Sequence, residues 1–151
     1  DVIRTAGANY LGPAAFAVPL LSAMTHQGKG HVVAVSTSSV DLPAPGWSAY
    51  IASKAAFDIW LGALVPELAK TGVSVTSVHL PRVATSMSAP TAGRYPVPEL
   101  TVEQAASIVG RAIVDRPRLI APWWARLGGA SWRLTPRVAD RVWSHLPERW
   151  W

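Results

Sequence analysis

Three short apolar runs, separated by longer stretches with helical periodicity, organise the hydrophobic and polar positions of this chain. The runs are "HVVAVS" (31–36), "VSVTSVHL" (73–80) and "RLIAP" (118–122). They are too short for helices, and the first two are rich in β-branched residues, a pattern typical of buried strands. We therefore expect three strands in the fold.

The segments around the first two strands are less regular. Residues 4–27 are rich in alanine and leucine and are predicted to be helical, but Gly12, Pro13 and Pro19 predict a bend or a break. Residues 81–98 contain four prolines and little periodicity, which predicts a long loop.

Two further helices have recognisable ends. One is expected from Ser48, a residue that suits the N-cap position, to about Lys70. The other covers residues 101–115 and opens with Thr101 and Gln104, the spacing of a capping box. The resulting order of helix, strand, helix, strand, helix, strand predicts parallel strands joined by right-handed crossovers, and so an α/β layered sheet.

Composition excludes several classes of protein. Half of the 151 residues are hydrophobic and 15% are charged, which excludes a disordered chain. No apolar run reaches the roughly 18 residues that a membrane span needs. The chain has no cysteine, which is compatible with a cytoplasmic location, and its four histidines lack the close spacing of metal ligands, so we expect no metal site.

The positive charge is concentrated at one end of the chain. Residues 1–110 carry six basic and six acidic side chains, whereas residues 111–151 carry eight arginines, three acidic residues and six of the eight tryptophans. Thr135 and Pro136 predict the start of a short amphipathic helix that reaches about Leu146. This helix suits an anionic membrane surface, or its apolar face docks on the domain or on a second subunit. No lysine-rich patch accompanies the arginines, so we expect no nucleic-acid binding.

The stretch "SAYIASKAAF" (48–57) places Tyr50 and Lys54 four residues apart in a predicted helix. Residues at this spacing stack on one face, with Cβ atoms about 5–6 Å apart. An ammonium that close is expected to lower the tyrosine pKa, so that the phenol works as a general acid and base. The alternative is a surface tyrosine beside a solvated lysine. A hydroxyl-rich turn at residues 36–39 favours a catalytic role for Tyr50 and Lys54, because open α/β sheets bind ligands at the carboxyl ends of their strands.

These elements together resemble the carboxyl-terminal half of a short-chain dehydrogenase/reductase. The shared features are the hydroxyl turn, the Tyr-x-x-x-Lys helix and a second strand end with a Pro turn, and the resemblance is strongest over residues 1–87. It implies a Rossmann-like doubly wound parallel sheet, present only as its second half with about three strands. Residues 1–122 then form the catalytic half, and residues 123–151 a basic, Trp/Arg-rich tail with a short amphipathic helix.

The resemblance also implies roles for individual residues. Tyr50 is the proton donor to the carbonyl oxygen during reduction and the base in the reverse direction. Lys54 lowers the Tyr50 pKa and hydrogen-bonds the nicotinamide ribose, which both residues help to bind. The position of the family's catalytic serine is taken by Thr37, with Ser36 and Ser38 near enough to be alternatives.

Other positions match the family less closely. Asn9 matches an asparagine that bends the preceding helix and holds a water in the proton relay. Pro81 is kept after the second strand, while Arg82 stands where the family commonly has glycine, which puts the local backbone geometry in question. Val83 and Thr85 complete the expected cofactor-binding turn, with Thr85 at the nicotinamide carboxamide. The cofactor is NAD or NADP. His79, just before this turn, is expected to be a packing residue.

The implied activity is the NAD(P)-dependent interconversion of a carbonyl and an alcohol, with a hydrophobic or lipid-like small-molecule substrate. No glycine-rich dinucleotide turn follows a first strand, so we expect a fragment that lacks the dinucleotide-binding half and is inactive alone. Its first strand then has an open apolar edge, and the complete protein is expected to be a cytoplasmic homo-oligomer whose tail contacts membranes peripherally. The alternative function is a non-catalytic α/β module for protein interaction or membrane-surface binding.

Overall fold

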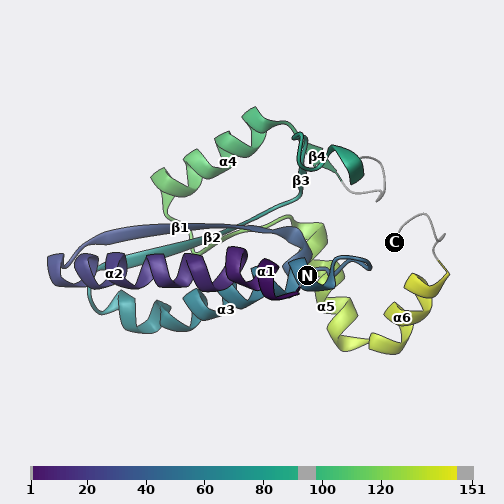
Figure 1. Cartoon of the computed structure of the whole chain (residues 1–151), viewed down its shortest axis with the longest axis horizontal. Coiled ribbons are helices and arrows are strands. Elements are labelled where there is room, and N and C mark those ends of the chain that lie inside the picture. Colours follow the sequence, from purple (N-terminus) through teal and green to yellow (C-terminus); the bar gives the residue numbers. More distant parts are fainter. Residues whose placement is uncertain (1, 92–97, 146–151) are drawn as a thin grey trace.

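A three-stranded parallel sheet with helices on both faces forms the body of the protein (Figure 1), in a computed structural model that describes residues 2–91 and 98–145. The sheet order is β1 (Gly30–Thr37), β2 (Val73–Leu80), β5 (Leu119–Ile120). The helices are α1 (Val2–Ala6), α2 (Gly12–Gln27), α3 (Ser48–Ala69), α4 (Val102–Asp115), α5 (Trp123–Leu134) and α6 (Pro136–Ser144). The shorter elements are the π turn η1 (Gly7–Leu11), the 3₁₀ turns η2 (Ser38–Val40) and η3 (Ala89–Thr91), and the strands β3 (Arg82–Val83) and β4 (Glu99–Leu100). The expected parallel α/β fold is confirmed.

The central strand β2 is buried on both faces. One hydrophobic cluster joins the sheet to α2 and α3 and consists of Ala17, Leu21, Ala34, Leu61, Leu68, Val73 and Val75. A second cluster joins β2 to α4 and consists of Val78, Leu80, Ala105 and Ala112. Every residue of β1 is paired with β2, from Gly30 opposite Val73 to Thr37 opposite Leu80. The carboxyl ends of both strands therefore lie side by side, fixed between two layers of helix.

The strands match the expectations with two differences. Those expected at 31–36 and 73–80 are confirmed, but the third is shorter than 118–122 because only Leu119 and Ile120 pair with β2. The segment expected to be loop contains β3, which forms a two-residue parallel ladder with β4. Residues 92–97 of that segment lie outside the described residues.

The helix predicted over residues 4–27 continues through the positions where the sequence predicted a bend or a break. The α1, η1 and α2 segments follow one another, and the irregularity expected near Gly12 takes the form of a π turn in which the Gly12 N–H donates to the Gly7 carbonyl oxygen. Pro19 lies inside α2 without ending it. Its position is exposed, so water can satisfy the carbonyl group that proline leaves without a donor.

Of the other three predicted helix starts, one is wrong and two are confirmed. Ser48 is not an N-cap: it is already the first helical residue, and Trp47 occupies the cap position without a side-chain hydrogen bond. Thr101 and Gln104 form the expected capping box at the start of α4. The tail helix begins at Pro136 as predicted, although Leu146, its expected end, lies outside the described residues. The helix α5 was not predicted.

The outer edge of β1 has no strand neighbour within residues 2–91 and 98–145, and Val35 on this strand is 45% exposed. None of the described helices is both long enough and apolar enough to cross a lipid bilayer.

Candidate active site at the carboxyl ends of β1 and β2

Tyr50 and Lys54 lie one turn apart near the start of α3, where the chain returns from the end of β1. Both side chains are half-buried. The Trp47 ring meets the Tyr50 ring edge to face, with centroids 5.8 Å apart, and the Thr37 side chain is close enough to the Tyr50 hydroxyl to lower its pKa. The structure thus brings Thr37 and Tyr50 together, with the Lys54 ammonium on the next turn of the same helix.

The pKa values of this pair differ from the expectation. Burial raises the pKa of Tyr50 above its ordinary value, and the interaction with the Thr37 side chain offsets only part of that rise. Burial also lowers the pKa of Lys54. The expected lowering of the Tyr50 pKa by Lys54 is therefore wrong for this structure, because burial is the largest influence on this pKa and raises it.

Of the hydroxyls at the end of β1 and in the turn that follows it, the Thr37 hydroxyl is the one close to Tyr50. Its Oγ1 accepts a hydrogen bond from the backbone N–H of Ser39 at 3.3 Å, which holds the turn closed beside Tyr50. The Ser36 hydroxyl is buried and has no hydrogen-bond partner among the described residues. Ser38 is also buried, with 7% of its surface exposed. The geometry favours Thr37 over both serines.

Asn9 is tied to the helix that carries Tyr50 and Lys54. It lies in the π turn η1, and its Nδ2 donates to Ser53 Oγ at 3.0 Å. Ser53 Oγ in turn donates to the backbone carbonyl of Tyr50 at 2.7 Å. A π turn changes the direction of the side chains it carries, which here aims Asn9 at α3. The expected water relay from Asn9 to Lys54 stays a prediction.

A buried charge cluster that the sequence did not reveal lies near Tyr50 and Lys54. His79, only 5% exposed at the end of β2, donates from Nδ1 to Asp41 Oδ2 at 2.7 Å. Its Nε2 lies 3.2 Å from Asp58 Oδ2, an ion-pair contact that is not aligned as a hydrogen bond. Asp41 follows the hydroxyl turn, and Asp58 lies one turn beyond Lys54 on α3. His79 is buried at the end of the strand, as expected of a packing residue, and it also contacts two carboxylates, which the sequence did not indicate.

The cluster favours a protonated histidine between two carboxylates. Burial opposes the charge on His79, but its contacts with Asp58 and Asp41 and their negative charges outweigh burial and raise the His79 pKa. Burial likewise acts to raise the pKa of Asp58, yet the contacts with His79 and Ser77 and the nearby Arg118 lower it overall. The cluster therefore clamps the hydroxyl turn, β2 and α3 together.

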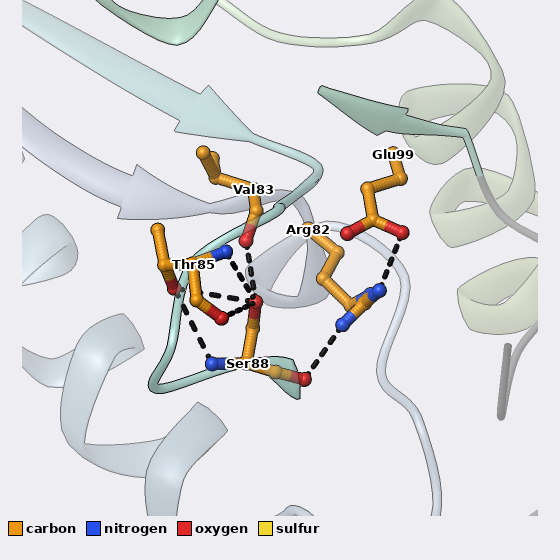
Figure 2. Close-up of polar contacts among 5 residues, drawn as sticks. All are labelled: Arg82, Val83, Thr85, Ser88 and Glu99. Atoms are coloured by element: carbon orange, nitrogen blue, oxygen red, sulfur yellow. Dashed lines mark hydrogen bonds and ion pairs between the residues drawn. The ribbon is translucent and has the colours of Figure 1, made fainter. Parts of the chain in front are cut away.

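The turn at the end of β2 is closed by a second set of polar contacts (Figure 2). Arg82 pairs with Glu99, and its Nη1 donates to the Ser88 carbonyl oxygen at 2.6 Å. Ser88 Oγ accepts from the Thr85 N–H at 3.1 Å and donates to the Val83 carbonyl. Arg82 lies in the short strand β3 and does not have a positive φ. An arginine in place of glycine therefore causes no backbone strain here.

The residues expected to bind a cofactor at this turn have different environments. Pro81 and Val83 are half-buried, whereas Thr85 is exposed and its hydroxyl interacts with Ser88. Their contacts with a cofactor stay predictions.

Helix α5 packs very closely on the loop that carries Asp41. Ala125 is fully buried, and a Cβ at Gly129 would lie 2.0 Å from the Asp41 carbonyl oxygen. A Cβ at Gly128 would lie 2.9 Å from Leu42 Cδ2. Gly129 is needed for this approach, because its neighbour is backbone, whereas the Leu42 side chain beside Gly128 can move; the tail therefore packs on the segment that follows the hydroxyl turn.

The surroundings of two helical glycines predict that substitution by alanine lowers stability at one and raises it at the other. We expect Gly129→Ala to lower the free energy of unfolding by about 1–3 kcal/mol, because its methyl group collides with backbone. Gly110→Ala, in α4 with open space around its Cβ position, is the matched control and is expected to raise stability by about 0.5–1 kcal/mol. Urea unfolding followed by circular dichroism measures both. Equal stabilities of the two variants would contradict the packing described.

Comparisons with known proteins identify relatives of this arrangement. A family model described as short chain dehydrogenase matches residues 1–95. A fatty acyl-CoA reductase from Acinetobacter baylyi is 37% identical over 138 residues, which cover 91% of this chain and 47% of that protein. A fatty acyl-CoA reductase from Mycobacterium tuberculosis is 38% identical, covering 94% of this chain and 49% of that protein. The chain spans about half the length of these curated relatives.

Solved structures show the same fold. A short-chain dehydrogenase from Burkholderia cenocepacia, in complex with NADP, superposes with a TM-score of 0.74 and 21% identity over 94% of this chain and 58% of that chain. A short-chain dehydrogenase from Sphingobium yanoikuyae, in complex with NADPH, gives a TM-score of 0.67 and 19% identity over 93% of this chain and 55% of that chain.

Proposed function

The chain belongs to the short-chain dehydrogenase family, and from this premise we propose that it supplies the proton-transfer site of an NAD(P)-dependent oxidoreductase that interconverts a carbonyl and an alcohol. The observation that carries the proposal is the proximity of Thr37 to the half-buried Tyr50, with the half-buried Lys54 on the next turn. In this proposal residues 1–122 perform the chemistry and residues 123–151 form an accessory tail.

The surroundings of Lys54 support a bound cofactor. Within residues 2–91 and 98–145 no acidic side chain lies within ion-pair distance of this ammonium, although burial already acts against its charge. A ribose hydroxyl can accept a hydrogen bond from it at this position. Tyr50, Pro81, Val83 and Thr85 complete the proposed cofactor-binding set, and the cofactor is NAD or NADP.

The proposed chemistry divides between cofactor and protein. The reduced nicotinamide supplies a hydride to the carbonyl carbon when it is bound. Tyr50 donates its phenolic proton to the carbonyl oxygen, and Thr37 donates a hydrogen bond that orients the same oxygen. With its raised pKa, Tyr50 is protonated before the substrate arrives, and its donation of the proton requires stabilisation of the phenolate. Lys54 then stabilises the phenolate that remains, and Asn9 fixes the start of α3 through Ser53.

The proposed substrate is hydrophobic. Two relatives at 37% and 38% identity are fatty acyl-CoA reductases, proteins named for substrates with long alkyl chains. The small-molecule substrate of this chain is accordingly a carbonyl compound or alcohol of that apolar kind.

Cofactor binding tests the proposal. NADH and NADPH are titrated separately while the tryptophans are excited and the nicotinamide emission is recorded, on the chain alone and on any longer protein of which it is part. We expect saturable emission with one of the cofactors. Lys54→Met is expected to weaken that binding by about 10- to 150-fold, the loss of one charged hydrogen bond.

Lys70→Met, at the exposed end of α3, is the matched control and is expected to bind like the wild type. If neither cofactor binds to either protein, or if the two lysine variants bind equally well, the proposal is wrong.

A further inference from the structure

Asp58 follows Lys54 by four residues on α3, so the two side chains lie on the same face of the helix. An acidic and a basic side chain at this spacing commonly form an ion pair. Both residues are half-buried and belong to the part of the chain that the structure describes, yet no ion pair joins them. The Asp58 carboxylate is engaged elsewhere.

His79 is the cation that the Asp58 carboxylate contacts. Asp58 Oδ2 lies 3.2 Å from Nε2 of the imidazole, and the other side of the ring is fixed by Asp41, 2.7 Å from Nδ1. Asp58 Oδ1 is buried and has no hydrogen-bond partner among the described residues. The charge of Arg118 also acts on this carboxylate. A charged oxygen without a partner is costly to bury, so Asp58 takes up another donor if the imidazole releases it.

Within the described residues, the Lys54 ammonium is left without a carboxylate partner. Burial lowers the pKa of Lys54. An ion pair with Asp58 would raise this pKa again, because a nearby negative charge favours the ammonium. A paired ammonium is also a poorer donor to a ligand, since the ligand has to displace the carboxylate first. The contact between His79 and Asp58 therefore keeps the lysine available for a ligand.

We propose that His79 is a positioning residue for the cofactor, which holds Asp58 away from Lys54 and so leaves the lysine ammonium free to donate to a ribose hydroxyl. This inference rests on the proposed function and deepens it, because it adds a residue of β2 that the Tyr-x-x-x-Lys motif does not contain. The buried cluster then does more than join the hydroxyl turn, β2 and α3, because it also decides which partner Lys54 takes.

Two substitutions separate the two contacts of the imidazole. In His79→Asn the side-chain amide nitrogen takes about the place of Nδ1, so a donor remains for Asp41 and Asp58 is released. In His79→Gln the amide nitrogen takes about the place of Nε2, so a donor remains for Asp58. Both variants lose the histidine charge, which makes His79→Gln the matched control. Circular dichroism establishes that each variant is folded.

The titration of Lys54 measures the competition for Asp58 without any cofactor. The chain has three lysines, so NMR on protein with ¹³C-labelled lysine gives few side-chain signals, with Lys29 and Lys70 as internal references. We expect a higher pKa of Lys54 in His79→Asn than in His79→Gln, because the released Asp58 carboxylate stabilises the ammonium.

Second substitutions identify the carboxylate responsible. Added to His79→Asn, Asp58→Asn is expected to return the pKa of Lys54 to the lower value, whereas Asp41→Asn is expected to leave it raised. Each double variant keeps one carboxylate and no histidine, so the two are matched in charge and also serve if the single variants do not fold. A purely structural role of His79 predicts that the two double variants behave alike.

Cofactor affinity gives the second readout, with the NADH and NADPH titrations described above. His79→Asn is expected to bind the cofactor about 2- to 5-fold more weakly than His79→Gln, the effect of one partly exposed ion pair on the ammonium. When Asp58→Asn is added to His79→Asn, the lost affinity is expected to return. When Asp41→Asn is added instead, the affinity is expected to stay low.

Equal pKa values of Lys54 in His79→Asn and His79→Gln overturn the inference, and so does equal behaviour of the two double variants. The result is separable from the proposed function. If the cofactor binds to both His79 variants with the same affinity, the inference is wrong and the proposed function stands. If neither cofactor binds to the wild type while Lys54 titrates as expected, the proposed function is wrong and the competition for Asp58 stands.

Discussion

Tyr50→Phe is expected to lower kcat for carbonyl reduction by about 10²- to 10⁴-fold, the range that a positioned general acid contributes. The change removes only the phenolic oxygen, so the ring keeps its edge-to-face contact with Trp47. Loss of the interaction between the phenolic oxygen and Thr37 is expected to cost no more than about 1 kcal/mol of stability, which leaves the fold intact. Cofactor oxidation at saturating substrate measures kcat, and urea unfolding measures stability.

Tyr10→Phe is the control for this prediction. Tyr10 lies in the π turn η1, and its hydroxyl has no role in the proposed proton transfer. The variant is expected to reduce substrate at the wild-type rate. A Tyr50→Phe variant that keeps more than a tenth of the wild-type kcat would mean that another group donates the proton.

His79→Ala is expected to destabilise the fold by about 3–5 kcal/mol, because it leaves two carboxylates facing each other without their cation. His79 is 5% exposed, and it contacts Asp41 at 2.7 Å and Asp58 at 3.2 Å. Urea unfolding at neutral pH measures the loss. His26→Ala, at an exposed position in the last turn of α2, is the control and is expected to change stability by less than about 0.5 kcal/mol.

The same cluster predicts how stability depends on pH. The pKa of His79 is raised in the folded state, so its contribution is complete below the ordinary histidine value near 6.5 and is lost as the pH rises through the raised pKa. The pKa of Asp58 is lowered, so its contribution is complete above its ordinary value near 3.8 and is lost as the pH falls through the lowered pKa. In the His79→Ala variant, we expect that the free energy of unfolding no longer falls as the pH rises through this range. An unchanged alkaline limb in this variant would contradict the assignment.

Local sequence patterns predicted most of the fold. The run at 73–80 is rich in β-branched residues, a pattern typical of a buried strand, and β2 has a central, buried position in the sheet. The capping box at Thr101 is likewise decided within one turn of chain. Helix α5 could not be predicted in this way, because its Gly128–Gly129 pair is a helix breaker in isolation. The pair is tolerated only because the Asp41 loop, distant in sequence, packs against it.

In the candidate site, too, local sequence patterns predict one part, and contacts between residues distant in the sequence decide the other. Tyr50 and Lys54 are four residues apart on one helix, so their relation follows from helical geometry. The cluster around His79 joins residues from three segments, with Asp41 38 positions away in the chain, and no local pattern indicates such a contact. The direction of the Tyr50 pKa shift was missed for a similar reason. It depends on burial by tertiary packing, which the spacing of two residues does not reveal.

The central claim is that Tyr50 delivers the proton in a nicotinamide-dependent carbonyl reduction. Transfer of label tests it most directly: the protein is incubated with NADH or NADPH deuterated at the reactive position and with a long-chain aldehyde, and the alcohol is analysed by mass spectrometry. The account predicts one deuterium on the carbinol carbon with the wild type and no alcohol above background with Tyr50→Phe. Unlabelled alcohol from the wild type, or equal labelled product from both proteins, would contradict it.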